Sequence, residues 1–151
     1  SKKLNKSQVL KKIIIINNFY KKYFNKKPKI AILGFNPHNF STEKKSEEKQ
    51  IIFPAIKKAR KKGIKLFGPV SPDTSFMNYK KYKFDVIVGL YHDQVLTPFK
   101  ALFNYNAINI TLGLPFIRIT PDHGVAENII GKKIANPTSL IHSIKFFNHV
   151  R

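Results

Sequence analysis

Cysteine is absent from the chain, and its absence excludes several kinds of chemistry at once. Without a thiol there is no disulfide framework, no thiolate nucleophile and no cysteine-type zinc site. Long apolar runs are missing as well: the longest aliphatic stretch is Ile13–Ile16, whereas a bilayer-spanning helix needs roughly 20 apolar residues. No signal-peptide core follows the basic first residues. We therefore expect a cytoplasmic protein without a membrane partner.

Acidic residues and arginine are scarce. The chain has 8 Asp and Glu against 28 Lys and Arg, a formal net charge of +20, which by itself points to nucleic acid or another anionic surface. However, only Arg60, Arg118 and Arg151 are arginines, and proteins that read bases depend on the planar arginine side chain. Lys, Asn and Ile, whose codons are A/T-rich, are all abundant, so we interpret most of the charge as genome composition. A small basic nucleic-acid-binding protein is the alternative, although no base-reading motif or repeat supports it.

The chain nevertheless has the composition of a folded domain, because 151 residues with 42% hydrophobic content can form one core. Helical periodicity alternates with buried apolar runs. Helices are expected at 7–24, 47–62, 97–103, 124–130 and 136–150, and strands at 29–35, 64–67, 84–90, 107–112 and 116–119. Gly63 is expected to end the second helix, and Thr97–Pro98 to begin the third. The alternation predicts an α/β fold, a layered and largely parallel sheet with flanking helices.

Ligands in such sheets bind beyond the carboxyl ends of the strands, where His38 and His92 each follow a predicted strand. If those strands are neighbours, both imidazoles project into one crevice, and imidazole is the commonest side-chain metal ligand. The alternative is two unrelated loop histidines. Asp93 is a candidate ligand, base or acceptor that orients an imidazole, and equally a capping residue.

Three polar residues near the later strands are candidates for binding an anion. Lys100 is expected near the N-terminus of the helix begun by Thr97, where a phosphate or carboxylate would fit, although a solvated lysine is the simpler interpretation. Asn109 and Arg118 lie in otherwise apolar strands, so we expect both to be partly buried and to need partners. Asp122 and His123 form either a dyad or a helix cap. No glycine-rich dinucleotide motif, P-loop or nucleophile elbow is present.

Several of these segments together resemble one known family. Gly34-Phe35-Asn36-Pro37-His38, Gly68-Pro69 with Asp73-Thr74, Tyr91-His92-Asp93-Gln94, the stretch 109–118 and Asp122-His123-Gly124 occur in the order and spacing of the C-terminal half of 4-hydroxythreonine-4-phosphate dehydrogenases. The resemblance extends from about Lys29 to Val150. It implies that residues 1–151 are the C-terminal portion of a two-domain subunit, with a leading helix in 1–28 and the family-matching segment in 29–150.

The resemblance also implies an activity. The family oxidises 4-phosphooxy-L-threonine with NAD, and the keto acid then loses carbon dioxide to give 3-amino-2-oxopropyl phosphate for pyridoxal phosphate synthesis. It uses a divalent metal (zinc, magnesium or cobalt) held by three His at a homodimer interface. His38 and His92 match two of these ligands, while Lys100, Asn109 and Arg118 match substrate-binding positions. The implied fold is that of isocitrate and isopropylmalate dehydrogenases, with NAD contacts that the sequence does not indicate.

Two features depart from the family pattern. The family protein is about twice as long, and the third metal His and a His-Thr substrate pair lie in the half outside this chain. Because a metal ligand and part of the substrate site are missing, we expect the chain to be inactive alone. It also begins with Ser1 instead of Met, so we expect it to begin inside a longer protein. Second, the loop 39–44 contains no glycine, where the family usually has a glycine-rich one, which affects the metal geometry expected at His38.

Overall fold

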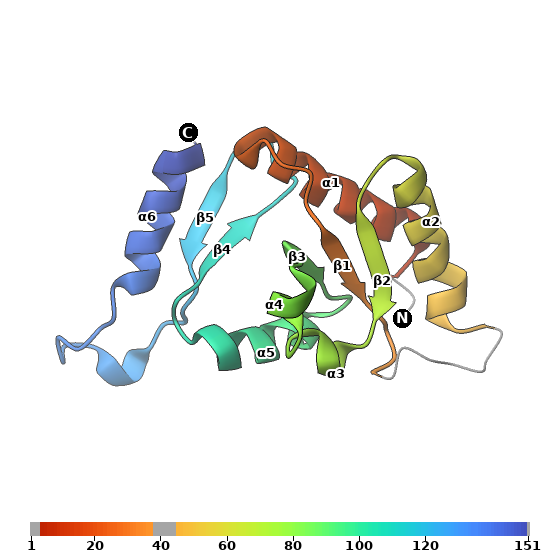
Figure 1. Ribbon diagram of the computed structural model, residues 1–151. Helices are drawn as coiled ribbons and strands as arrows, with labels where there is room; N and C mark the ends of the chain where they lie inside the picture. The colour runs from red at the N-terminus through yellow and green to blue at the C-terminus, as the bar shows by residue number, and fades with distance from the viewer. Residues whose placement is uncertain (1–3, 38–44, 151) are drawn as a thin grey trace. The chain divides into compact units, whose positions relative to one another are not determined.

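The computed structural model describes residues 4–37 and 45–150, and the chain divides into two compact units, Ser1–Pro98 and Phe99–Arg151. Figure 1 shows the elements of both units. Each unit is described below by itself.

The first unit contains a three-stranded parallel sheet and the helices around it. Strand order is β2-β1-β3, with β1 at Ile30–Leu33, β2 at Leu66–Val70 and β3 at Val86–Val88. Its helical elements are α1 (Lys6–Phe24), the π-helical turn η1 (Glu48–Ile52), α2 (Phe53–Lys61), α3 (Pro72–Ser75), α4 (Tyr79–Tyr82) and the first part of α5 (His92–Phe103). Because β1 is central, the strand that leads toward His38 runs directly beside the one that leads toward His92.

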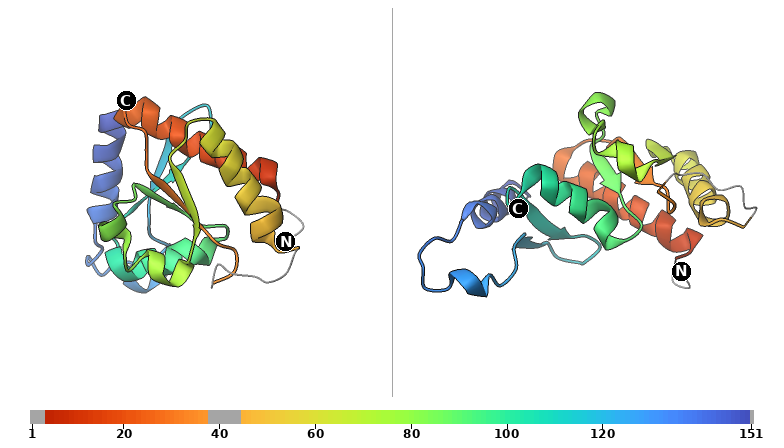
Figure 2. Two further views of the ribbon diagram at one scale, coloured as in Figure 1. Left: turned by 45° about the vertical axis from the view of Figure 1, so that its right-hand side comes forward. Right: turned by 90° about the horizontal axis from the view of Figure 1, so that it is seen from below.

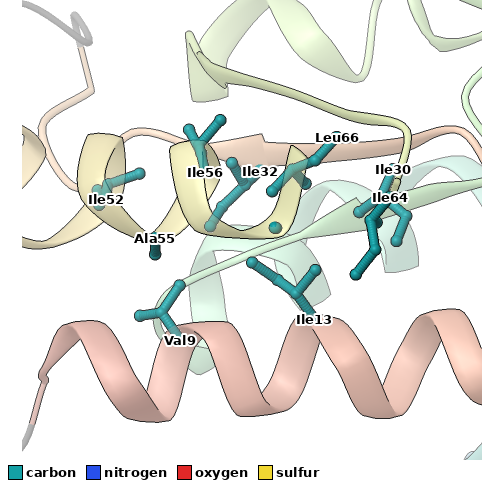
Figure 3. Packing of buried hydrophobic residues seen from close by; sticks show 10 residues of the cluster. Val9, Ile13, Ile30, Ile32, Ile52, Ala55, Ile56, Ile64 and Leu66 are labelled. Carbon is teal, nitrogen blue, oxygen red and sulfur yellow. The ribbon is translucent and has the colours of Figure 1, made fainter. Parts of the chain in front are cut away.

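The hydrophobic core of this unit lies where α1, η1 and α2 meet β1 and β2. All four residues of β1 are fully buried. The apolar side chains of the two long helices reach the same cluster, with Val9 and Ile13 from α1 and Ile56 from α2 (Figure 3). α1 and α2 also contact each other, and Figure 2 shows the two helices from two further directions. Burial of a large aliphatic side chain stabilises by roughly 1.5–3 kcal/mol, so this cluster is the main source of stability in the unit.

Local signals set the ends of these helices. The Asn5 side chain accepts a hydrogen bond from the Gln8 backbone N–H at 2.9 Å and caps the start of α1, and Asn25 ends that helix in a left-handed conformation. Gly63 follows α2 with φ +75°, a conformation that glycine adopts without strain. The predicted end of the second helix at Gly63 is therefore confirmed.

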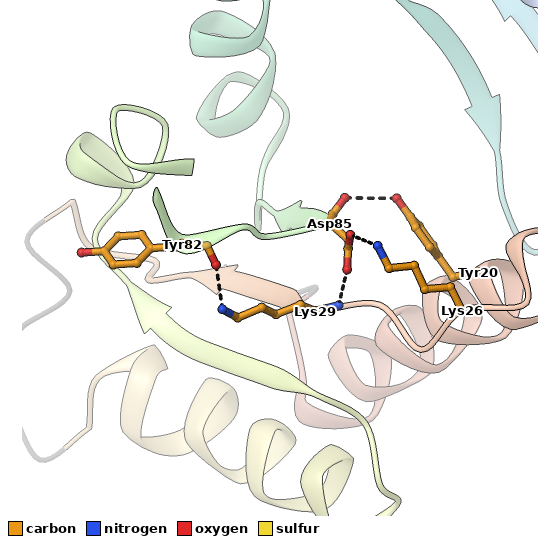
Figure 4. A network of polar contacts seen from close by, with 5 residues as sticks. All are labelled: Tyr20, Lys26, Lys29, Tyr82 and Asp85. Atoms are coloured by element: carbon orange, nitrogen blue, oxygen red, sulfur yellow. Dashed lines mark hydrogen bonds and ion pairs between the residues drawn. The ribbon is translucent and has the colours of Figure 1, made fainter. Parts of the chain in front are cut away.

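A polar network fixes the amino ends of β1 and β3. The Asp85 carboxylate accepts hydrogen bonds from Lys26 Nζ at 2.5 Å and from the Lys29 backbone N–H at 2.8 Å, and Tyr20 donates to the Asp85 carbonyl at 3.1 Å (Figure 4). Partial burial raises the pKa of Asp85, but the hydrogen bonds and positive charge of Lys26 and Lys29 outweigh it, so the pKa lies below its usual value. The network ties the C-terminal end of α1 to the sheet.

The second unit is built from an antiparallel pair of strands and one long helix. β4 (Ile108–Thr111) pairs with β5 (Arg118–Pro121), and α6 (Thr138–Val150) packs against both strands. A short 3₁₀ helix, η2 (Glu127–Ile129), lies between β5 and α6. The Asn136 side chain accepts from the Thr138 backbone N–H at 2.9 Å, as expected of the residue that begins the last helix.

The predicted α/β layers are confirmed, but several details were wrong. β4 and β5 form a separate antiparallel pair instead of extending the parallel sheet, and β3 is half-buried where a fully buried strand was expected. α5 begins at His92, so Pro98 lies inside the helix and Thr97 is not its cap. The helix expected at 124–130 is only the short η2. None of the helices in the described parts of the chain has both the length and the hydrophobicity to cross a bilayer.

Candidate functional site

The first candidate region is the carboxyl edge of the parallel sheet. β1 and β3 are adjacent and in register there, with Ile32 opposite Val88. The two histidines were expected to share a crevice if their strands are neighbours, and the strands are neighbours. His38 itself lies outside the described residues, so its part in the expected pair stays a prediction.

His92 is the first residue of α5 rather than a loop residue. Its side chain is 77% exposed, and its Nδ1 lies 2.7 Å from Oδ1 of Asp93. This contact favours the proton on Nδ1 and leaves Nε2 as the nitrogen available to a ligand. A carboxylate that orients an imidazole in this way is the usual surrounding of a metal-binding histidine.

The donor set fits a divalent metal only in part. Within residues 4–37 and 45–150, no three His, Asp or Glu side chains form a group that could hold a metal ion. His92 could supply one nitrogen ligand, with Asp93 holding its ring in place. A complete site needs about three protein ligands, so His92 could take part in one only with ligands from beyond the described residues.

The second candidate region is a cavity of about 490 Å³ in the second unit. It is lined by Lys100, Asn109, Thr120, Pro121, Asp122, His123 and Gly124. Lys100 Nζ lies 2.7 Å from the Asp122 carboxylate and donates to the Asp122 carbonyl at 2.7 Å. Asp122 is held in turn by Ser139, whose Oγ accepts from the Asp122 backbone N–H at 2.8 Å. The cavity thus presents an ammonium group in a defined position beside an amide.

The structure brings together two of the three predicted substrate residues. Lys100 and Asn109 line this cavity, while Arg118 does not. Arg118 is exposed and donates to Thr111 Oγ1 at 2.9 Å, across the strand pair. Asn109 is exposed as well, so the expectation that both were partly buried was wrong. The reason is that the described part of the second unit has no layer over this face of the strands.

The expected setting of Lys100 was also wrong. Because α5 begins at His92, Lys100 lies in the last turns of the helix and not near its N-terminus. A cation there interacts favourably with the helix dipole, and free N–H groups do not surround it. Its attraction for an anion would come from its own charge and its place in the cavity.

Sequence reasoning missed a second cavity in this unit, of about 660 Å³, between the segment that follows β5 and the start of α6. Its apolar walls include Val125, Ile130 and Ile134, which are 82%, 71% and 66% exposed, and His123 and Asn136 add polar groups. A lining of mostly apolar side chains with a few polar groups is common in pockets for small organic molecules. The sequence offered only the helix expected at 124–130, which gave no sign of a cavity.

Known proteins match this chain over nearly its whole length. A family model described as "Pyridoxal phosphate biosynthetic protein PdxA" matches residues 1–147. A 4-hydroxythreonine-4-phosphate dehydrogenase from Sulfurihydrogenibium sp. is 48% identical over 144 residues, which are 94% of this chain and 44% of the relative. A D-threonate 4-phosphate dehydrogenase from Salmonella typhimurium is 41% identical over 143 residues, with the same coverage of 94% and 44%.

A solved structure agrees with these matches. The crystal structure of 4-hydroxythreonine-4-phosphate dehydrogenase from Klebsiella pneumoniae has a TM-score of 0.80 and 36% identity, and the match covers 99% of this chain and 45% of that one. The α/β dehydrogenase fold expected from the motifs is therefore confirmed. The chain spans less than half the length of the proteins that it matches.

Proposed function

The chain belongs to the PdxA family, and on that premise we propose that it is part of an NAD-dependent dehydrogenase of pyridoxal phosphate synthesis. The reaction is the oxidation of 4-phosphooxy-L-threonine and the loss of carbon dioxide to give 3-amino-2-oxopropyl phosphate. The observation that carries the proposal is the cavity in which Lys100 and Asn109 lie together. A nucleic-acid-binding role is not carried forward, because family membership accounts for the motifs without it.

Lys100, Asn109 and Arg118 bind the phosphorylated substrate in this proposal. Lys100 offers an ammonium group that Asp122 already holds in place, so little side-chain entropy is lost when an anion binds. Asn109 supplies both a donor and an acceptor for a hydroxyl or carboxylate. Arg118 lies on the neighbouring strand, where it donates to Thr111 Oγ1, and its planar guanidinium suits a phosphate.

His92 binds the divalent metal, together with His38 and a ligand from outside this chain. Asp93 contributes to the reaction indirectly, because it holds the His92 ring so that Nε2 is available to the metal. The 2.7 Å contact between His92 Nδ1 and Asp93 Oδ1 supports this role. When bound, the divalent cation supplies positive charge to the oxygen that is oxidised, and NAD accepts the hydride.

NAD binds, in this proposal, with the face of one planar ring against the apolar walls of the larger cavity, which include Val125, Ile130 and Ile134. The exposed aliphatic walls support this choice, because a planar ring would cover apolar surface that otherwise meets water. His123 and Asn136 line the same cavity and offer polar groups to the cofactor. No glycine-rich dinucleotide motif is needed for such a pocket.

The proposed activity belongs to a larger assembly than this chain. We place residues 1–151 in the C-terminal portion of a two-domain subunit of a homodimer, with the active site at the interface. Coverage of 44% and 43% of the length of two relatives supports this assignment. The chain alone should therefore not turn over, since part of the metal and substrate sites would be missing.

D-threonate 4-phosphate is a second candidate substrate, favoured by the relative that is 41% identical. Both compounds are four-carbon acids with a phosphate at C4, and they differ in carrying an amino group or a hydroxyl at C2. The exposed cavity around Lys100 and Asn109 does not by itself select between them. We rank the threonine compound first on the higher identity of 48%.

The test uses a reconstituted subunit, defined as this chain combined with the part of the Sulfurihydrogenibium relative outside their 144-residue match. We expect NADH formation from 4-phosphooxy-L-threonine by the reconstituted subunit and none by either part alone. His92→Ala should reduce the rate by at least about 100-fold, and the matched His142→Ala on α6 should leave it unchanged. Faster turnover of D-threonate 4-phosphate would select the second candidate, and no NADH from either substrate would refute the proposal.

A further inference from the structure

Ser139 has a buried hydroxyl group in the first turn of α6, and this group joins the two strands of the second unit. Its Oγ donates to the Ala107 carbonyl at 2.5 Å, directly before β4. The same oxygen accepts from the Asp122 backbone N–H at 2.8 Å, directly after β5. The residue is 1% exposed, so water does not compete for either bond. The hydroxyl therefore holds the end of β5 at a defined distance from the start of β4.

The end of β5 leads to the charged group of the cavity of about 490 Å³. Lys100 Nζ contacts the carboxylate and the carbonyl oxygen of Asp122, at 2.7 Å each. Lys100, Asn109 and Asp122 all line that cavity. The hydroxyl of Ser139 is thus one contact away from the residue that holds the ammonium group.

The contacts of Lys100 leave part of its ammonium group for a ligand. An ammonium group has three N–H donors, and Asp122 takes two of them. Within residues 4–37 and 45–150 no other hydrogen bond of this group is found, so the third N–H is available in the cavity. The Asp122 carboxylate also carries a negative charge that weakens the attraction of Lys100 for a phosphate. Asp122 therefore contributes to anion binding through direction and not through charge.

Asn109 does not depend on Ser139 in the same way. It lies inside the ladder of β4 and β5, opposite Thr120, whereas Asp122 lies beyond the last pair of that ladder. The backbone of Asn109 is held by the strand pair itself. The backbone of Asp122 is held by Ser139, so loss of this hydroxyl would release Asp122 and leave Asn109 in place.

We infer that Ser139 is a positioning residue for the phosphorylated substrate, because its hydroxyl holds Asp122 and thereby directs the Lys100 ammonium group into the cavity beside Asn109. The inference rests on the proposed function, which assigns substrate binding to Lys100 and Asn109. A binding group that is already held in place loses less freedom when its ligand binds. Without the hydroxyl, the buried N–H of Asp122 loses its partner and the segment after β5 is free to shift.

The first test measures substrate binding by the reconstituted subunit. Isothermal titration with 4-phosphooxy-L-threonine is carried out without NAD, because Ser139 is also among the residues that line the larger cavity. Ser139→Ala should raise the Kd about 3- to 10-fold, since Lys100 must then be ordered on binding. Ser143→Ala is the matched control: it removes the same atom from a buried serine of α6, whose hydroxyl bonds within the helix to the Ser139 carbonyl at 2.9 Å. This control should bind as the wild type does.

The second test asks whether Ser139 acts through Lys100. Lys100→Met removes the ammonium group and should raise the Kd about 10- to 100-fold. Adding Ser139→Ala to Lys100→Met should then change the Kd by less than about twofold. An equal effect of Ser139→Ala in both backgrounds would show a merely structural role, and the inference would be wrong. At saturating NAD, Ser139→Ala should raise the KM for the substrate and leave kcat within about twofold; a lower kcat with an unchanged KM would also contradict the inference.

The remaining outcomes separate this inference from the proposed function. If Ser139→Ala does not fold, as judged by circular dichroism, Ser139→Cys replaces it with the same expectations, because a thiol fills nearly the same space and forms weaker hydrogen bonds. Equal or tighter substrate binding by the Ser139 variant, together with weaker binding by Lys100→Met, would overturn the inference and leave the proposed function standing. If Lys100→Met binds the substrate as tightly as the wild type, the proposed substrate site fails, and the role of Ser139 toward it fails too.

Discussion

The two units of this chain differ sharply in where they keep their apolar side chains. Among the described residues, all buried hydrophobic residues belong to the first unit except Ala107 and Val150. The second unit is the shorter one, yet it holds more than half of the large hydrophobic side chains that are exposed. The first unit has a core of its own, whereas the second presents apolar surface to its surroundings.

Helix α6 shows the difference most clearly. The side that packs on β4 and β5 carries the small buried residues Ser139 and Ser143, while Leu140, Ile144 and Phe147 are 49%, 54% and 42% exposed. Helices of folded domains usually bury their large apolar side. A two-stranded sheet is also marginally stable by itself. We therefore expect the second unit to be completed by polypeptide that the longer relatives have and this chain does not include.

The largest effect is expected on the free energy of unfolding, when an isoleucine is shortened to alanine in the first unit and, for comparison, in the second. Ile32→Ala in β1 should lower the free energy of unfolding by about 2–5 kcal/mol, because Ile32 is fully buried and a cavity remains. Ile144→Ala in α6 should lower it by less than about 0.5 kcal/mol in the isolated chain. Urea denaturation measures both values, and equal losses would show that the second unit has a core that the comparison overlooks.

An intermediate effect is expected when the exposed side of α6 is made polar. Ile144→Asp should leave the stability of the isolated chain nearly unchanged. It should weaken the binding of this chain to the part of the Sulfurihydrogenibium relative outside their match at least about tenfold, or about 1.4 kcal/mol. Isothermal titration calorimetry measures the affinity. Met77→Asp, the same kind of change at a side chain 80% exposed in the first unit, is the control. Equal affinity of Ile144→Asp and the wild type would argue against α6 as the completed surface.

The smallest effect concerns the polar network of the first unit. Because the pKa of Asp85 is lowered in the folded state, the unfolded chain binds the extra proton first, and stability falls as pH drops below about 4. Asp85→Asn should cost about 1 kcal/mol at neutral pH, since Lys26 is half-exposed and water screens the pair. The variant should lose less additional stability in acid than the wild type. Urea midpoints measured across pH 3–7 give both values, with Glu127→Gln in the second unit as control.

Elements with strong local signals were predicted well. The periodic apolar residues of 7–24 correspond to α1, and the apolar run 29–35 contains the fully buried β1. The Asn136 cap also marked the start of the last helix. Each of these signals depends on neighbours within a few residues, which is the range that a sequence pattern reports.

Elements decided by distant contacts were predicted poorly. Thr97–Pro98 is a typical helix start, yet α5 begins at His92, where Gln94 reaches Gly34 and Leu90. The contact between Gln94 and Gly34 joins residues 60 positions apart, and it outweighs the local preference of the Thr-Pro pair. Asn109 and Arg118 were expected to be partly buried because their strands are apolar, but exposure depends on which layer covers a strand. The functional roles of the candidate site residues stay predictions; these residues are His38, His92, Asp93, Lys100, Asn109 and Arg118.

The sequence by itself determined the family, the alternation of helices and strands, and the residue types that can bind a metal or an anion. Only the tertiary structure decided that β1 and β3 are neighbours, that Lys100 and Asn109 share a cavity, and that Gln94 ties two strand ends together. The physical reason is range. Helical periodicity and caps act within one or two turns, whereas the position of a site depends on contacts between residues far apart in the chain.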